Sequence, residues 1–456
     1  MVNLSKASIL PTKQRATHTY VIGQPGSGKS KLLESWILQD LQAGRGLCLL
    51  DPHGDLFHNV LAAVAHMPTL WERLVIINPI NPTWAVQLNP LHVPPGTTPE
   101  RIAHFLTDII LKIWKLEPHL APRMTWLTAN TFCALAELQL PITTTARFLM
   151  DPGFRNEWVD KISNTDTRFY FQQEFPTQQQ QVREWVSPLL NKLGSFLHDP
   201  DISAMFTKQN GINLRTLMDQ RAVILAYLPK GLLGENTSNL LGAFIVAQTQ
   251  QAALSRKTQQ EREPFYLYLD EFQNYTTDNI SDILSEARKY QLSMILAHQY
   301  LAQLDDDIQA AVLNTSGTLA CFRTGFDDAL RLAKHVFPTK DFQAKTKTSI
   351  DFKEIRSVWI PNLKTEKEQG DWDRLAYRIA NQKARQFWVR KRSEREPVHL
   401  RSKDVQTIPI TPTVKRQIRL LIDSSGRRYA RLKRSSGERN HKQQKPKQDR
   451  PSMWGV

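Results

Sequence analysis

The residues with the clearest chemical meaning form one glycine-rich run near the beginning of the chain: Gly23-Gln24-Pro25-Gly26-Ser27-Gly28-Lys29-Ser30. This run fits the phosphate-binding pattern of Gly, four variable residues, Gly, Lys and Ser or Thr. Its glycines let successive N–H groups turn toward phosphates, Lys29 can reach the terminal phosphates, and the Ser30 hydroxyl can bind Mg²⁺. The sequence therefore predicts a nucleotide site with ATP and Mg²⁺ as cofactors.

An acidic pair, Asp270 and Glu271, follows the apolar run Phe265–Leu269. At the end of a strand we expect Asp270 to face the metal and its waters. Glu271 is then left to orient and deprotonate an attacking water. The pair favours hydrolysis over simple nucleotide holding, so the sequence predicts an ATPase.

Four other positions are candidates for the same crevice. Gln299 ends the next predicted strand, where it is either a sensor of the γ-phosphate or an ordinary loop glutamine. Asp51 ends the strand after the phosphate-loop helix and could hold the metal's water shell, because ligands bind at the carboxyl ends of parallel strands. Arg288 and Arg323 are candidates for an arginine lent by a neighbouring subunit, and each is equally a surface or ion-pairing residue.

The elements that must position these residues alternate between short apolar strands and helices. A strand at Thr19–Ile22 leads into the glycine-rich loop, and a helix at Lys29–Leu41 follows it. Later strands are expected at Leu47–Leu50, Leu74–Ile77, Ala222–Leu228, Phe265–Leu269, Ser293–Ala297 and Leu319–Arg323. This alternation predicts an α/β fold, a RecA-like P-loop NTPase with a mostly parallel sheet.

Two segments depart from the alternating pattern. Residues 92–215 show helix-period apolar positions and little strand pattern, which predicts an all-helical insertion between ATPase parts at 1–91 and 216–395. The last segment, 396–456, is polar and rich in breakers, so it is expected to form a basic, flexible and disordered tail.

The net charge of +15 lies wholly toward the C-terminus. Residues 371–456 hold 23 Lys and Arg against 8 Asp and Glu, so the preceding residues balance to zero. A basic segment of this kind contacts polyphosphate such as DNA, RNA or anionic lipid, unless it is simply solvated. No apolar run approaches the length of a bilayer span, which predicts a cytoplasmic protein that reaches a membrane through partners or through its own basic surface.

Five segments resemble the HerA/FtsK superfamily, and most closely the type IV secretion coupling ATPases of the TraD and TraG type: GQPGSGKS, DPHGDL, LDEFQN, SEARKYQLSMILAHQYLAQL and NTSGTLACFRTGFDDALRLAKHVF. The resemblance implies a homo-hexameric ring with ATP sites between subunits and a channel that grips DNA. It also implies relaxase, relaxosome or secretion-channel proteins as partners. The roles it implies are nucleotide and Mg²⁺ binding for Lys29 and Ser30, metal organisation for Asp51 and Asp270, catalytic base for Glu271, sensor for Gln299, and action in trans for Arg288 or Arg323.

The leading hypothesis is an ATP-driven DNA translocase or coupling ATPase that moves DNA through a ring during conjugative or mobile-element transfer. One alternative is a HerA-like motor that works with a nuclease in DNA end processing or defence. The other is an ATP-gated docking adaptor without translocation. ATP turnover that responds to DNA favours a motor, and turnover indifferent to DNA favours the adaptor.

Overall fold

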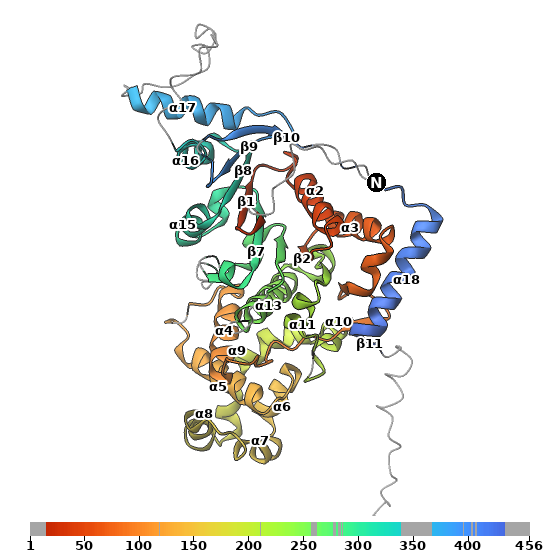
Figure 1. The fold of residues 1–456 in the computed structure, drawn as a ribbon. Helices are drawn as coiled ribbons and strands as arrows, with labels where there is room; N and C mark the ends of the chain where they lie inside the picture. The colour runs from red at the N-terminus through yellow and green to blue at the C-terminus, as the bar shows by residue number, and fades with distance from the viewer. Residues whose placement is uncertain are drawn as a thin grey trace, which may run out of the picture.

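The computed structural model describes residues 15–117, 119–209, 211–256, 262–276, 280, 284, 286–338, 367–394, 396–402, 405 and 408–433. Segments far apart in the chain build one nine-stranded sheet in the order β10-β9-β8-β1-β7-β6-β2-β5-β3 (Figure 1). The strands are β1 (Thr19–Ile22), β2 (Gly46–Asp51), β3 (Leu74–Ile77), β5 (Val223–Tyr227), β6 (Phe265–Leu269), β7 (Leu292–His298), β8 (Thr318–Phe322), β9 (Gln386–Lys391) and β10 (Val398–Arg401).

The sheet is mostly parallel, as the sequence predicts. Strand β9 is antiparallel to both of its neighbours, β8 and β10, and the other pairings are parallel. Strand β7 lies between β1, which carries the glycine-rich loop, and β6, which carries the acidic pair. This inserted strand defines the RecA-like arrangement, so the predicted fold class is confirmed.

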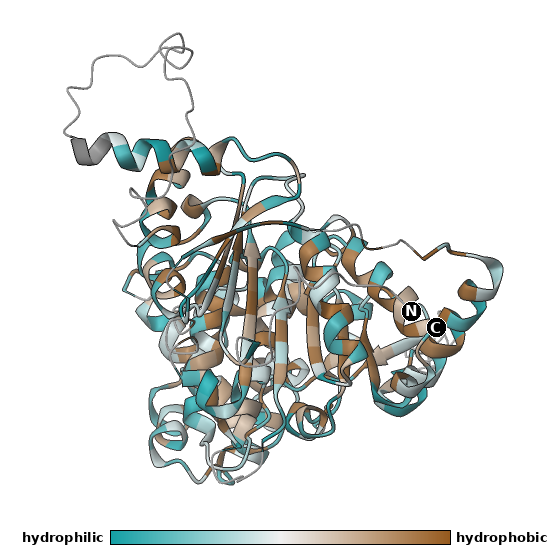
Figure 2. Ribbon diagram, turned by 45° about the horizontal axis from the view of Figure 1, so that its top comes forward, coloured by the Kyte–Doolittle hydropathy of each residue, from teal (hydrophilic) through white to brown (hydrophobic). Residues whose placement is uncertain are grey.

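Alternate residues of each strand enter two separate cores, because successive side chains of a strand point to opposite faces. Tyr20 and Ile22 face one core and Val21 the other. The Val21 core lies under α2 (Lys29–Gln42), α3 (Asp55–Ala65) and α18 (Pro412–Tyr429). The opposite core is covered by α13 (Glu235–Leu254), α15 (Asp306–Thr315), α16 (Phe326–Val336) and α17 (Lys367–Ala380). Figure 2 shows the brown strands between helices whose outer faces are teal.

Between β4 (Trp84–Val86) and β5, the regular elements of the described residues are all helical. They gather at one end of the molecule, away from α17 (Figure 1). The α-helices are α4 (Pro99–Ile113), α5 (Pro122–Glu137), α6 (Thr145–Met150), α7 (Pro152–Val159), α8 (Thr165–Phe169), α9 (Gln179–Leu197), α10 (Pro200–Ser203) and α11 (Leu214–Asp219). The short α12 (Lys230–Leu233) follows β5.

The expectation of a flexible tail is wrong for Val398–Arg401, Pro412–Tyr429 and Ala430–Leu432, which form β10, α18 and β11. Thr411 caps α18 by accepting from the Val414 N–H (3.3 Å), and Val414 and Leu421 are buried. Strand β11 pairs with β4. The apolar residues of α18 form a narrow stripe among many charges, so average composition conceals the helix. Residues 434–456 of the predicted tail lie outside the described part.

Candidate nucleotide-binding site

The glycine-rich loop joins β1 to α2 and leaves the N–H groups of α2 available. Gly26 and Gly28 have positive φ values of 74° and 113°, which the curl of the loop requires. Helix α2 has no side-chain cap and no acidic residue in its first turn. Its amino end therefore suits an anionic ligand, since helix N-termini carry partial positive charge.

The Lys29 side chain folds back onto the glycine-rich loop. Its ammonium donates to the carbonyls of Gly23 (2.5 Å) and Gln24 (3.3 Å). Burial lowers the Lys29 pKa, while the charges of Glu271 and Asp270 oppose that shift. The Ser27 hydroxyl is buried without a hydrogen-bond partner among the described atoms. An unsatisfied buried hydroxyl and open helix N–H groups fit the phosphates of a nucleotide.

Asp270 occupies the carboxyl end of β6, where its N–H donates to the Leu50 carbonyl (3.2 Å). Burial, followed by the nearby charges of Asp51 and Glu271, raises the pKa of Asp270 to about 7. Within the described residues, no group of three or more His, Cys, Asp or Glu could hold a metal alone. Mg²⁺ in nucleotide sites instead takes one or two protein oxygens together with phosphates and water. Ser30 and Asp270 fit that arrangement.

The Asp51 carboxylate accepts hydrogen bonds from backbone N–H groups of the residues that follow it. The donors are the N–H groups of His53 (2.8 Å), Gly54 (2.9 Å) and Phe57 (2.8 Å). The DPHGDL segment is thus a turn that Asp51 ties to the start of α3. The contribution of Asp51 to metal organisation stays a prediction, and the contact shown here is structural.

Glu271 lies between two amides at the carboxyl edge. The Gln299 amide donates to Glu271 Oε1 (2.9 Å), and the Gln273 amide donates to Oε2 (2.8 Å). Glu271 also has a left-handed backbone, with φ 52° and ψ 52°. Such strain in a residue other than glycine concentrates at functional sites. The structure therefore places the predicted base and the predicted sensor in direct contact.

Gln273 and Gln303 are site residues that the sequence analysis missed. The side-chain oxygen Oε1 of Gln303 accepts from the backbone N–H groups of Gln299 (3.0 Å) and Tyr300 (3.1 Å), which holds the turn that presents Gln299. Both glutamines lie within segments that carry the family resemblance. Their spacing alone did not distinguish them from loop residues.

The two candidate arginines lie at opposite ends of the strands: Arg323 follows β8, and Arg288 precedes β7. The Arg323 carbonyl accepts from the Gln24 N–H (2.8 Å), so Arg323 borders the glycine-rich loop of its own subunit. Arg288 precedes β7, within the short helix η7 (Ala287–Tyr290), and is exposed. The length of β7, roughly 20 Å, separates Arg288 from Gln299. Arg288 is therefore outside the site of its own subunit.

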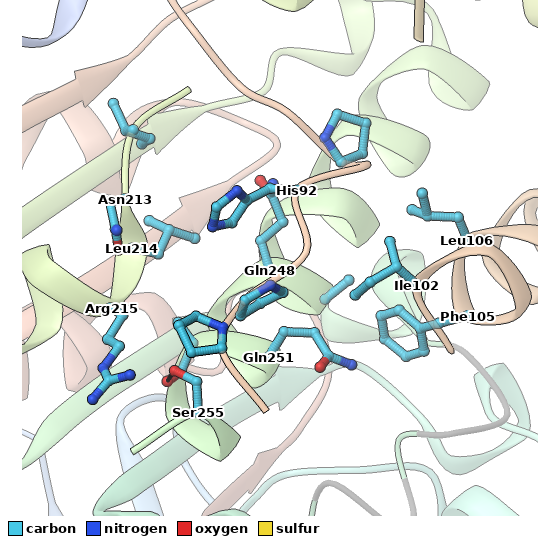
Figure 3. A pocket seen from close by; sticks show the side chains of 16 residues that line it. His92, Ile102, Phe105, Leu106, Asn213, Leu214, Arg215, Gln248, Gln251 and Ser255 are labelled. Atoms are coloured by element: carbon cyan, nitrogen blue, oxygen red, sulfur yellow. Dashed lines mark hydrogen bonds between the residues drawn. The ribbon is translucent and has the colours of Figure 1, made fainter. Parts of the chain in front are cut away.

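One hollow lies elsewhere, at the junction of the helical segment with α13. It measures about 180 Å³. Figure 3 shows Ile102, Phe105 and Leu106 on one side of it and Asn213 and Arg215 on the other. None of the candidate site residues lines it. The hollow is thus separate from the candidate nucleotide site at the carboxyl ends of the strands.

The raised pKa of Asp270 predicts a pH-dependent stability. Its pKa of about 7 in the folded state exceeds the ordinary value of 3.8, so between these pH values mainly the unfolded state is ionised. Stability is consequently lost as pH rises through 7. In EDTA, Asp270→Asn should melt above the wild-type protein at about pH 8, and the gap in Tm should narrow by more than half toward about pH 5. A gap independent of pH would contradict this account.

Fold and site together define a P-loop NTPase of the additional-strand class. Residues 264–330 match the family described as "TraM recognition site of TraD and TraG". The expected resemblance to TraD- and TraG-type coupling proteins is thereby confirmed over that segment. No curated protein sequence matches the chain.

Solved structures show the same fold over most of the chain. The unbound bacterial conjugative coupling protein TrwBdeltaN70 is similar with a TM-score of 0.62 and 14% identity, covering 88% of this chain and 89% of that chain. TrwB in complex with ADP and Mg²⁺ gives a TM-score of 0.59 at 14% identity, with coverage of 88% and 89%. VirB4 of Thermoanaerobacter pseudethanolicus gives 0.51 at 12% identity, with coverage of 88% and 91%.

Among the described residues, no helix combines the length and the hydrophobicity that crossing a membrane requires.

Proposed function

We propose that the protein is an ATP-driven DNA translocase, a coupling ATPase of the type IV secretion kind that moves DNA through a ring during conjugative or mobile-element transfer. The observation that carries this proposal is the Gln299–Glu271 contact opposite the Lys29 loop, within the fold of TrwB. A carboxylate held beside a sensor amide serves hydrolysis and not storage of nucleotide.

ATP and Mg²⁺ are the cofactors of this function. Their support is the phosphate-fitting loop together with the TrwB structure that contains ADP and Mg²⁺. Lys29 would hold the terminal phosphates, and Ser30 and Asp270 would hold the metal. When bound, the metal would neutralise charge that develops on the transferred phosphoryl group.

A homo-hexameric ring accounts for the position of Arg288. If this exposed arginine, at the amino end of β7, acts in catalysis, it must serve the site of another subunit, and phosphoryl-transfer sites gain much of their rate from such a residue. Relaxase, relaxosome or secretion-channel proteins would supply the substrate and any membrane attachment. The match of residues 264–330 to a TraM-recognition family supports that class of partner.

DNA contact is assigned to the outer face of α18. Lys415, Arg416, Arg419 and Arg427 are exposed there; Lys415 and Arg419 lie four residues apart, and Arg427 lies eight residues further along the helix. Each phosphate that a cation neutralises steepens the salt dependence of duplex binding by about 0.9. Replacing all four residues by glutamine should lower the slope of log K against log salt by about 1 to 4.

The control for α18 removes the same charge from the helical segment, through Arg101, Lys161, Arg183 and Lys208, which are also exposed. Filter binding or anisotropy across a salt series measures both quadruple variants. Equal slopes for the α18 variant and the wild-type protein would remove α18 from the DNA surface.

The test of the function as a whole joins two measurements on the same sample. ATP turnover and particle size are recorded without DNA and with single- or double-stranded DNA. The proposal expects faster turnover and a ring-sized particle when DNA is present. Turnover indifferent to either DNA would favour a docking adaptor without translocation.

A further inference from the structure

The chain between α17 and β9 packs directly against the glycine-rich loop. The Arg385 N–H donates to the Ser27 carbonyl (2.7 Å). Phe322 and Phe387 stack beside it with ring centroids 4.7 Å apart. A segment far along the chain therefore forms one wall of the nucleotide site.

Arg385 is held in a conformation that residues with a side chain rarely adopt. Its φ is 70°, in the left-handed region. Hydrogen bonds on both sides impose this geometry: Gln386 N donates to the Lys383 carbonyl (3.0 Å), and Ser402 N donates to the Arg385 carbonyl (2.8 Å). Strain of this kind persists where the surrounding structure over-determines it, and it is common in ligand clamps.

The Arg385 side chain starts out across the amino end of α2. A Cβ atom added to Gly28 would lie 3.2 Å from Arg385 Cα and 3.3 Å from Arg385 Cγ. Because Cγ is about as close to Gly28 as Cα is, the first part of the side chain runs alongside Gly28. Helix α2 begins there, so a side chain extended in this direction would bring its guanidinium toward the N–H groups that suit phosphates.

We propose that Arg385 is a nucleotide-binding residue that contacts the phosphates of a nucleotide in its own subunit. The proposal rests on the nucleotide site of the proposed function. Lys29 shares the site with the carboxylates of Asp270 and Glu271, so a polyphosphate needs further positive charge. A guanidinium supplies it with a planar fork of donors that matches phosphate oxygens.

The decisive variant is Arg385→Gly, because glycine accepts the left-handed backbone and keeps the N–H that bonds Ser27. Only the side chain is lost. Titrating the full chain with ADP and with tripolyphosphate by calorimetry should show affinities about 10- to 100-fold weaker for both ligands. Arg385→Lys should recover part of the loss, since the charge returns without the fork.

Arg221→Gly is the matched control. Arg221 also has a positive φ, 54°, but it precedes β5 at the opposite edge of the sheet and pairs with Glu263. The affinity of the Arg221→Gly variant for ADP and for tripolyphosphate should equal that of the wild-type protein.

The outcomes separate this inference from the proposed function. If the wild-type chain binds ADP and Arg385→Gly binds it equally well, the inference fails and the ATPase stands. If Arg385→Gly binds ADP more weakly but tripolyphosphate as well as the wild-type protein does, the proposed phosphate contact is overturned, and Arg385 contacts the ribose or the base. Equal weakening by Arg221→Gly also overturns it, because the effect would then be general. A wild-type chain that binds neither ligand would reject the proposed function itself.

Discussion

Glu271→Gln is expected to lower kcat for ATP by about 10²- to 10⁴-fold while nucleotide binding survives. The glutamine keeps the size of the side chain and can still bond one of the two amides, Gln299 or Gln273, that flank the carboxylate. It cannot accept a proton from water. The loss should therefore fall on turnover, while the Lys29 loop continues to bind phosphates. Steady-state ATPase assays and ADP titration measure the two quantities separately.

The matched control for this variant is Glu263→Gln. Glu263 pairs with Arg221 at the opposite edge of the sheet (2.6 Å), so removal of its charge should leave kcat unchanged. Wild-type turnover in Glu271→Gln would show that another group deprotonates the water. Loss of ADP binding would show instead that Glu271 shapes the pocket.

Arg288→Ala is expected to reduce kcat by about 10³- to 10⁵-fold, the range for an arginine supplied in trans. Each subunit should still bind ADP, because Arg288 is separated from its own loop by the length of β7. Arg323→Ala serves as the comparison. Arg323 contacts Gln24 through its backbone carbonyl, which the substitution keeps, so Arg323→Ala should retain the nucleotide affinity and most of the rate of the wild-type protein.

Mixing two inactive variants identifies which subunit supplies Arg288. In a ring of Glu271→Gln and Arg288→Ala subunits, some interfaces combine an intact Glu271 from one subunit with an intact Arg288 from its neighbour. Such mixtures should regain ATPase activity in proportion to those interfaces. If Arg288 served its own subunit, each site would carry one defect and the mixture would stay inactive.

Local patterns alone predicted the glycine-rich loop, the acidic strand end and most of the parallel strands. The phosphate loop needs consecutive residues with particular backbone freedom, and a buried strand needs a short apolar run between turns. Thr19–Ile22, Leu74–Ile77 and Phe265–Leu269 accordingly have the bounds that the sequence predicted. Chemistry encoded by neighbours in sequence can be predicted without knowledge of the fold.

Contacts between distant segments depended on the tertiary structure. The order of β1, β7 and β6 decides that Gln299 meets Glu271, and the return of β9 against β8 decides that Arg385 reaches the loop. The same topology places Arg323 beside the glycine-rich loop of its own subunit and Arg288 at the amino end of β7. Strand order and register depend on how whole faces of the sheet pack. The hydrophobic period of one segment does not specify which strand it will pair with. Helix α18 was missed for that reason, since its narrow apolar stripe has meaning only against α3 and β3.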